Sequence, residues 1–278
     1  MVAPVSIDDA LARRLVLHEA RVQQAPGREL RDLGDAWLLH DPFDTEPFWN
    51  RMLAPAWPVQ PAAFDRRLDE AITLFATLGR MPHIRPLPLG NRPADLGARL
   101  FASGFLALGT DRRMVLVDPR PSLDLARRGP VVPGTRIVRA PREAPGLDAF
   151  ATAVSLVLAE SFSVERRRVA ALEVDAIGCG GRPECEIVLL EVHGEPVAAA
   201  RRVTIDGGTY LSSIGTRPGW QGQGHASLVT ATAVADALAA GSVFVHLAVE
   251  VDNQRATRLY ERLGFVVVGE PVPDLLLA

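Results

Sequence analysis

Lysine is missing from this chain of 278 residues, so all 30 of its Lys and Arg positions are arginines. Without lysine there is no Walker-type P-loop, no Schiff-base enzyme and no Ser-Lys dyad. Lysine avoidance beside abundant Ala, Arg, Gly and Pro also fits a GC-rich genome. The formal net charge of −3 leaves no electrostatic footprint for nucleic acid, so we expect no nucleic-acid partner.

Cysteine is scarce as well, because only Cys179 and Cys185 occur. Their spacing is not C-x-x-C and no second pair could complete a zinc site, so we expect free thiols and no metal. No apolar run reaches the roughly 20 residues of a membrane span. Residues 1–15 include Asp8 and Asp9 and lack the apolar core of a signal peptide. These absences predict a cytoplasmic protein with no membrane partner.

The first half of the chain has a weak but readable pattern. A hydrophobic content of 48% is ample for a core, and the length suits one large domain or two ordinary ones. Apolar spacing predicts helices over 6–23 and 62–79, whereas residues 36–60, rich in Pro and aromatic side chains, are expected to be irregular but packed. Several Pro and Gly breakers predict a linker at 119–134.

Beyond this linker, strands and helices follow one another in a clear order. The pattern predicts strands at 135–140, 185–192, 197–205, 209–216, 243–250 and 265–268, and helices at 147–175, 225–240 and 253–263. Tight turns join the early strands into antiparallel hairpins, and a β-loop-α-β-α-β order follows them. The fold class expected is α/β, with a mixed, mainly antiparallel sheet and flanking helices.

Two segments of the chain, 83–109 and 246–269, resemble each other. Asn, Ala, Leu and Gly-Phe recur in the same order in both once two residues are inserted, at Asn91, Ala94, Leu100, Gly104-Phe105 and at Asn253, Ala256, Leu263, Gly264-Phe265. The match is either a coincidence or the trace of a tandem repeat of one fold. In a tandem, the first copy has lost any glycine loop, because nothing in residues 36–80 reproduces one.

The most informative segment is 214–226, where a predicted strand turns into a predicted helix. Gly222, Gly224 and Ala226 let backbone N–H groups converge there, and the helix dipole favours a negative ligand. We therefore expect a phosphate group near residues 221–226. A Rossmann motif fits poorly, since Ser227 takes the third glycine position and no acidic residue occurs at 242–247. A glycine-rich surface turn that binds nothing is the other interpretation.

Two motifs together resemble those of the GCN5-related N-acetyltransferase (GNAT) superfamily. Gln221, Gly224 and Ala226 are similar to the family's [Q/R]-x-x-G-x-[G/A] loop, and its second signature resembles Asn253, Ala256, Leu259, Tyr260, Gly264 and Phe265. The detailed resemblance covers 212–266, and the order of elements extends it to 135–278. It implies a GNAT-like acyl-CoA N-acyltransferase fold, with 131–278 as the catalytic domain and 1–130 as a degenerate or accessory copy.

The resemblance implies acetyl-CoA, or another acyl-CoA, as the donor co-substrate. Its pyrophosphate would bind backbone N–H groups of the loop, and its pantetheine arm would pair with the strand before the loop, which in the family separates from its neighbour. The residues implied for the pyrophosphate are Gln221, Gly222, Gln223, Gly224, His225 and Ala226. Those implied for the pantetheine arm are Ile214, Gly215 and Thr216. Asn253 would bond the pantetheine or stabilise the strand separation. Tyr260 matches the family's frequent general acid, although a core aromatic at helical spacing is the alternative.

The implied reaction is direct attack of a primary amine, on a small molecule or a peptide, on the thioester. A base must take the amine's proton, and the candidates are Glu250, His246 and Glu191, of which Glu250 is our choice; each also suits a surface or structural role. Ser212 and Ser213 stand where some family members have an acidic base. A non-catalytic acyl-CoA sensor or partner-binding module therefore stays open, as does a nucleotide-binding enzyme. We expect a monomer or a homodimer.

Overall fold

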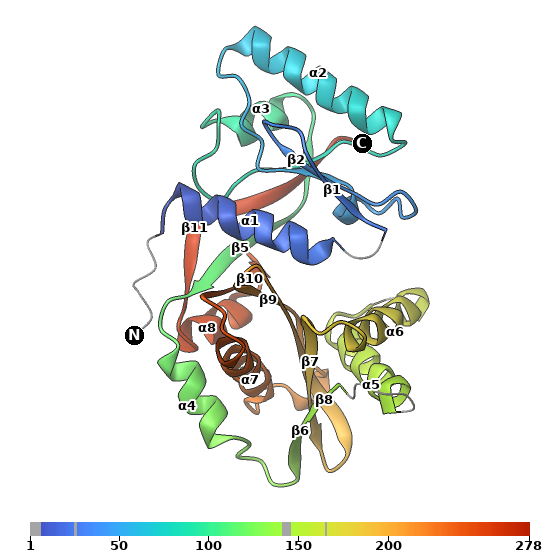
Figure 1. Cartoon of the computed structure of the whole chain (residues 1–278), viewed down its shortest axis with the longest axis vertical. Helices are drawn as coiled ribbons and strands as arrows, with labels where there is room; N and C mark the ends of the chain where they lie inside the picture. Colours follow the sequence, from blue (N-terminus) through green and yellow to red (C-terminus); the bar gives the residue numbers. More distant parts are fainter. Residues whose placement is uncertain (1–6, 25–26, 141–145, 165) are drawn as a thin grey trace.

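The computed structural model describes residues 7–24, 27–140, 146–164 and 166–278, and its strands form one eleven-stranded sheet (Figure 1). Their order across the sheet is β1-β2-β3-β4-β11-β5-β10-β9-β8-β7-β6. The pairs β3–β4 and β9–β10 are parallel, and the other neighbours are antiparallel. The predicted fold class, a mixed and mainly antiparallel sheet with flanking helices, is confirmed.

The elements of the second half follow the predicted order, whereas strands β1 to β5 and helix α3 of the first half were not predicted. The first half contains α1 (Asp9–Gln23), β1 (Glu29–Asp32), β2 (Trp37–His40), η1 (Pro47–Trp49), β3 (Arg51–Leu53), α2 (Pro61–Thr77), β4 (His83–Arg85), α3 (Leu96–Ala102) and β5 (Leu106–Leu116). The second half contains α4 (Arg120–Arg128), β6 (Thr135–Arg139), α5 (Gly146–Ser161), α6 (Arg166–Gly180), β7 (Cys185–Val192), β8 (Glu195–Ile205), β9 (Gly208–Thr216), η2 (Pro218–Trp220), α7 (His225–Ala239), β10 (Phe244–Glu250), α8 (Gln254–Arg262) and β11 (Phe265–Leu276).

Helix α1 begins later than its predicted start at residue 6, a position outside the described residues. Asp8 is its N-cap, and the Asp8 carboxylate accepts a hydrogen bond from the backbone N–H of Leu11 at 2.8 Å. This bond satisfies one of the N–H groups that the first helical turn leaves without a partner. The local sequence therefore fixes where this helix begins.

The linker predicted at 119–134 is wrong, because most of it is helix α4, which packs against α7. Pro121 lies in the first turn of α4, where a missing N–H removes no hydrogen bond, and Gly129 ends the helix. Residues 36–60 are also more regular than expected, since they contain β2, η1 and β3. Pro47 and Pro121 therefore lie at the start of helical elements rather than in irregular segments.

Strands β5 and β11 form a long antiparallel ribbon that pairs with strands of both halves of the molecule (Figure 1). β5 precedes the predicted boundary at 130/131, yet it also pairs with β10. β11 was expected to end at residue 268, but it continues through a bulge after Val268, and its last residues Leu275 and Leu276 pair with β4. Each half therefore contributes a strand to the sheet of the other. The boundary stays a prediction, since the sheet is continuous across it.

The two halves repeat the same succession of elements beside this ribbon. In the first half the parallel pair β3–β4 is followed by Asn91, α3, Gly104 with a φ of 92° and β5. In the second half the parallel pair β9–β10 is followed by Asn253, α8, Gly264 with a φ of 97° and β11. This correspondence supports the tandem interpretation. The loops before α2 and α7 differ, because the loop before α2 holds the buried Trp57 in place of a glycine cradle.

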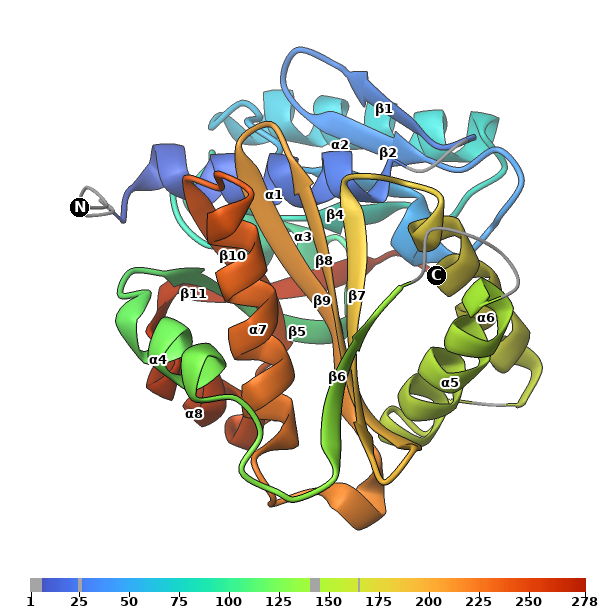
Figure 2. The same ribbon diagram turned by 60° about the horizontal axis from the view of Figure 1, so that its bottom comes forward.

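Helices cover the C-terminal strands on both faces (Figure 2). Val188 and Leu190 of β7 join a core with residues of α7 and α8, whereas Ile187 and Leu189 join a second core with α5 and α6. This alternation places α5–α6 and α7–α8 on opposite faces of the sheet. Among the described residues, no helix has both the length and the apolar character needed to span a bilayer.

Three arginines are completely buried where α1 crosses the sheet: Arg51, Arg85 and Arg113. Three carboxylates balance them. Arg113 pairs with Glu19, Arg85 pairs with Asp111 and Asp274, and Arg51 lies 3.3 Å from Glu19. These groups come from α1, β3, β4, β5 and β11, so one network of charges joins the first half to the β5–β11 ribbon.

The charge state of Glu19 depends on this network. Burial by itself would raise the pKa of the Glu19 carboxyl, but the positive charges of Arg113, Arg51 and Arg85 outweigh it and hold the pKa well below its ordinary value. Glu19 therefore stays ionised in the interior. A buried ion pair that loses one partner leaves the other charge without compensation, which is strongly destabilising.

The expectation of free thiols is wrong, because Cys179 and Cys185 form a disulfide. The bond joins the end of α6 to the start of β7, and both cysteines belong to the core between α5, α6 and the sheet. A spacing of six residues gave no hint of this pairing. The turn at residues 181–184 brings the two sulfur atoms together.

Replacing Glu19 by Gln should destabilise the fold by about 3–5 kcal/mol at pH 7, since Arg113 and Arg51 lose their shared counter-charge. Urea unfolding measures the change. Asp206→Asn is the matched control, because Asp206 pairs with Arg21 at an exposed site, and it should cost less than about 1 kcal/mol.

The effect of Glu19→Gln should also depend on pH. The folded-state pKa of Glu19 lies below its unfolded value near 4.5, so its contribution is complete above that pH and declines as the pH falls. The difference in stability between wild type and E19Q should therefore shrink in acid. Equal stabilities at pH 7 would contradict the role given to the network.

Candidate functional site

The site begins where the parallel strands β9 and β10 stop pairing. The two strands pair from Gly208 opposite Phe244 to Leu211 opposite Leu247, and within the described residues they do not pair beyond this point. Just beyond, β9 makes a bulge against β8, and Ser213 adopts a left-handed φ of 50°. The backbone of residues 212–216 keeps its bonds to β8 on one side and is open toward β10 on the other. This separation matches the one that the GNAT resemblance implies for the strand beside a pantetheine arm.

The glycine loop lies at the end of β9. Gly222 and Gly224 have φ values of 83° and 85°, in the left-handed region that favours glycine. Gly224 is also the N-cap of α7, and no side chain caps this helix end. The first N–H groups of α7 are therefore available to a ligand, and the positive end of the helix dipole points the same way.

One cavity of about 490 Å³ joins this loop to helix α8. The cavity brings together almost all residues proposed for the donor: Ile214, Gly215, Thr216, Gln221, Gly222, Gly224, His225, Ala226, Asn253 and Tyr260. Gln223 lies outside its lining. Residues 214–226 and 253–260, which are more than 25 residues apart in the sequence, thus line the same cavity.

The cavity wall also contains residues that sequence reasoning missed. Ser161 and Phe162 come from the end of α5, and Arg255 and Arg262 come from α8. A Cβ on Gly215 would come within 2.8 Å of the Ser161 side chain, so the glycine allows α5 to approach β9 closely. Arg255, Leu259 and Arg262 recur at i, i+4 and i+7 on one helical stripe, but this pattern alone does not distinguish a cavity wall from an exposed helix face.

Two buried polar atoms in the cavity wall suit a polar ligand. Thr216 Oγ1 and His225 Nε2 have no hydrogen-bond partner within the described part of the chain. Burial lowers the pKa of His225, so its imidazole stays neutral near pH 7. Unpaired polar atoms are costly unless a ligand or water bonds to them. The residues present therefore fit a phosphate-bearing, amide-rich molecule such as CoA.

Asn253 and Tyr260 hold different positions on α8. The Asn253 Oδ1 atom accepts a hydrogen bond from the backbone N–H of Ala256 at 3.0 Å, so this side chain caps the helix. Tyr260 is 6% exposed and packs edge-on against Phe265 while it lines the cavity. Burial raises the pKa of the Tyr260 phenol, which therefore keeps its proton at neutral pH.

The three candidate bases lie in different surroundings. Glu250 is exposed at the end of β10, in register with Asp111 of β5, and outside the cavity lining. His246 is fully buried beneath α1, where its Nε2 lies 2.9 Å from His18 Nδ1, and burial lowers its pKa well below the usual value. Glu191 pairs with Arg136 at 2.6 Å on the outer strands. Glu250 is thus the one of the three that is both exposed and near the separation of β9 and β10.

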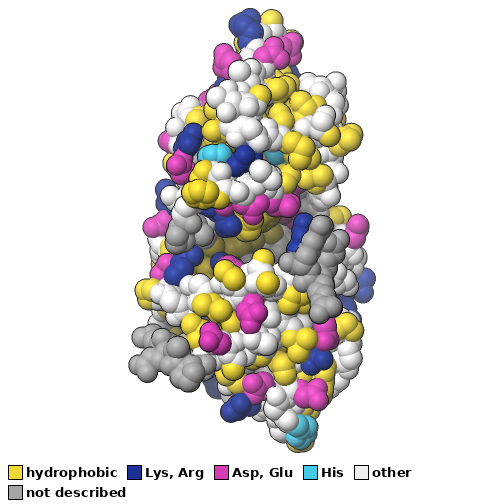
Figure 3. Space-filling view, turned by 90° about the vertical axis from the view of Figure 1, so that its right-hand side faces the viewer, with side chains coloured by type: hydrophobic (Ala, Val, Ile, Leu, Met, Phe, Trp, Pro, Cys, Tyr) yellow, Lys and Arg dark blue, Asp and Glu magenta, His cyan; other side chains and the backbone are white. Residues whose placement is uncertain are grey.

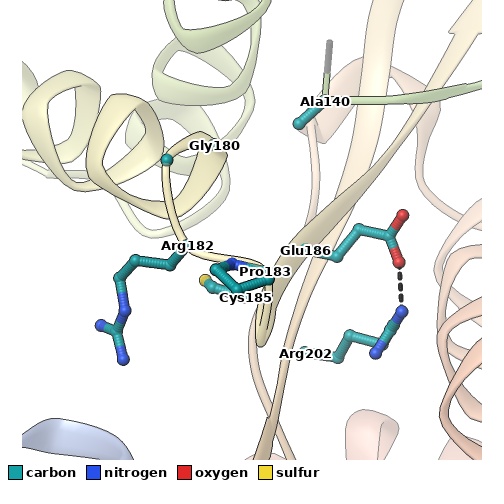
Figure 4. Close-up of a pocket in the computed structure, with 8 residues that line it drawn as sticks. Ala140, Gly180, Arg182, Pro183, Cys185, Glu186 and Arg202 are labelled. Atoms are coloured by element: carbon teal, nitrogen blue, oxygen red, sulfur yellow. Dashed lines mark hydrogen bonds and ion pairs between the residues drawn. The ribbon is translucent and has the colours of Figure 1, made fainter. Parts of the chain in front are cut away.

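A second cavity, of about 320 Å³, lies beside the disulfide between the end of α6 and strands β7 and β8 (Figure 4). Glu186 and Arg202 face each other there as an ion pair, and Arg182 extends away from them and bonds to Glu184. Its charged side chains are already neutralised by one another. This cavity therefore offers less to a charged ligand than the one beside the glycine loop.

Known proteins share this fold and part of this sequence. Residues 154–265 match the model of the acetyltransferase (GNAT) family. A GCN5-related N-acetyltransferase from Kribbella flavida has 20% sequence identity and a TM-score of 0.72, with 98% of this chain and 96% of that chain covered. A tandem GNAT protein from the clavulanic acid biosynthesis pathway has 16% identity and a TM-score of 0.60 over 99% of this chain and 97% of that one.

One curated relative matches over a short segment. The mycothiol acetyltransferase of Nocardiopsis dassonvillei is 43% identical over 54 residues, which make up 19% of this chain and 16% of that protein. The fold is shared with these GNAT structures, and the family match supports acyl transfer. The segment that matches the acetyltransferase (GNAT) family model runs from within α5 to the start of β11.

Gly224→Glu should weaken CoA binding by at least about a hundredfold, because the new carboxylate would oppose the phosphates at the start of α7. Isothermal titration calorimetry measures the loss. Gly241→Glu is the matched control, since Gly241 has a φ of 86°, a Cβ there would likewise meet nothing within 4 Å, and it follows the opposite end of α7. Equal affinities of Gly224→Glu and wild type would refute the loop assignment.

Proposed function

We propose that this protein is an acetyl-CoA-dependent N-acetyltransferase that transfers an acetyl or other acyl group to a primary amine of a small molecule or peptide. One observation carries the proposal. The glycine loop, the open edge of β9 and the Tyr260 hydroxyl-bearing ring all line one cavity, at the point where two parallel strands separate. The family match supports acyl transfer, and the donor and acceptor are our assignments.

The donor, when bound, supplies a thioester carbonyl and a thiolate leaving group. The chain's own residues bind and orient it: N–H groups of residues 222–226 bind its phosphates, and backbone groups of 214–216 pair with its amides. Thr216 Oγ1, which is buried and has no hydrogen-bond partner among the described residues, is a further hydrogen-bonding group on this path. Binding of both ends at fixed positions lowers the entropic cost of reaction.

Tyr260 is our general acid. A thiolate needs a proton as it leaves, and the Tyr260 phenol, whose pKa is raised by burial, carries one at neutral pH. Its ring lies in the wall of the cavity, near the end of α8. Tyr260 follows Asn253 by seven residues, which is about 10 Å along the helix axis.

The amine would approach from the face of the sheet that α5 and α6 cover, opposite the face covered by α7 and α8. Figure 3 shows a hollow on the side of α5 and α6, between the first half above and the second half below, with acidic and basic side chains at its rim. Arg168 of α6 and Glu46 before η1 lie 3.6 Å apart, so α6 meets the first half there. Glu250, exposed and without an ion-pair partner among the described residues, is our base for the amine's proton.

Turnover of acetyl-CoA with a panel of primary amines, followed by thiol release, tests the proposal. Amine-dependent release of CoA is expected with at least one acceptor class. Tight acetyl-CoA binding without thiol release on any amine would favour the acyl-CoA sensor instead. Absence of acetyl-CoA binding would overturn the proposal altogether.

Tyr260→Phe should lower kcat by about a hundredfold and change the dissociation constant for acetyl-CoA less than about threefold, because only the proton donor is lost. Steady-state kinetics and calorimetry together measure this. The chain has one other tyrosine, Tyr210, which is buried on β9 and does not line the cavity, so Tyr210→Phe is the control. A kcat for Tyr260→Phe equal to that of the control would remove the general-acid role.

A further inference from the structure

The donor cavity has an uneven distribution of charge. Among the described residues that line it, Arg255 and Arg262 are cations and none is a carboxylate. Both arginines project from α8, outside the glycine loop and outside the motif positions. A wall of this kind favours an anionic ligand over a neutral one.

Arg255 lies against the glycine loop itself. Its Nη1 donates a hydrogen bond to the side-chain Oε1 of Gln221 at 2.8 Å. Its Nη2 lies 3.9 Å from the position that a Cβ on Gly222 would occupy. Helix α8 thus brings a guanidinium to the same place toward which the first N–H groups of α7 point.

The hydrogen-bond partner of Arg255 is a neutral amide, unlike the partners of Arg217 and Arg201. Arg217 pairs with Glu160 at 2.8 Å, and Arg201 pairs with Asp175 at 2.6 Å. Within the described chain, no carboxylate lies within 4.0 Å of the Arg255 guanidinium. Its charge is therefore not compensated by the protein, and one amide bond occupies only part of its five-donor fork.

The loop supplies little positive charge of its own. Residues 218–224 carry no cationic side chain, and the His225 imidazole is neutral because burial lowers its pKa. A helix N-terminus contributes roughly half an elementary charge. A pyrophosphate bridge carries two negative charges, so a guanidinium beside the loop is needed to balance them, and its planar fork suits two phosphate oxygens.

We propose that Arg255 is a phosphate-binding residue of the donor site: its guanidinium exchanges the Gln221 amide for the pyrophosphate. The site would then select acyl donors that carry a diphosphate, such as acyl-CoA, over acyl-pantetheine donors that lack one. This inference rests on the proposed function, since it assumes that the cavity binds CoA.

Calorimetry on the full chain tests it with three ligands: CoA, 3′-dephospho-CoA and S-acetylpantetheine, the last at millimolar concentrations in competition with CoA. Arg255→Gln should weaken the binding of CoA and of 3′-dephospho-CoA by the same factor, about tenfold or more, because a hydrogen-bonded charge is lost. Binding of S-acetylpantetheine should not change. Arg258→Gln is the matched control, since Arg258 is on the same helix but outside the cavity lining, and it should weaken none of them.

The melting temperature of ligand-free Arg255→Gln should equal that of Arg258→Gln, which separates lost binding from a loosened loop. A loss confined to CoA would mean that Arg255 binds the 3′-phosphate and would overturn the assignment. An equal loss for S-acetylpantetheine, or no loss at all, would also overturn it. If wild type itself fails to bind CoA, the proposed function fails; if wild type and Arg255→Gln bind alike, only this inference does.

Discussion

The antiparallel pairing of β5 with β11 is the constraint on which the rest of the molecule depends. β5 separates β10 from β11 in the C-terminal sheet, and the end of β11 extends the sheet of the first half by pairing with β4. Neither half has a complete sheet without the strand of the other. The buried charges lie on the same ribbon, because Arg113 and Asp111 belong to β5 and Asp274 to β11. Loss of register there would disturb both halves together.

The ribbon also determines where the donor cavity forms. β5 pairs with one edge of β10, so β10 is fixed while its other edge separates from β9 after Leu247. The bulge at Ser213 turns β9 away on the opposite side. The chain then places a helix N-terminus on each side of the opening, α7 after the glycine loop and α8 after Asn253. In our account, phosphate binding and acyl transfer both follow from this one separation of strands.

Much of the second half was predictable from sequence because its signals are local. Apolar runs and tight turns define β7 to β9, and the spacing of Gln221, Gly224, Asn253 and Tyr260 predicts one donor site. These four residues line one cavity. The pairing partner of a strand is not a local property. Nothing near Gly269-Glu270-Pro271 indicates that β11 continues past its bulge to reach β4.

The first half gave weaker signals for a physical reason. Strands β1 to β4 are only three or four residues long, and Arg51, His83 and Arg85 interrupt the apolar pattern that reveals a strand. Their counter-charges lie far away in sequence, as Arg85 and Asp274 show. The disulfide and Arg255 were missed likewise, since a six-residue spacing and an arginine on a helix are each too common to indicate a contact.

A crystal structure of the full chain in complex with CoA tests the central claim most directly. The account predicts the pyrophosphate within about 3 Å of backbone N–H groups of residues 222–226, the pantetheine arm along residues 214–216, and the sulfur beside the Tyr260 hydroxyl. CoA bound elsewhere, or with its phosphates away from the glycine loop, would contradict it.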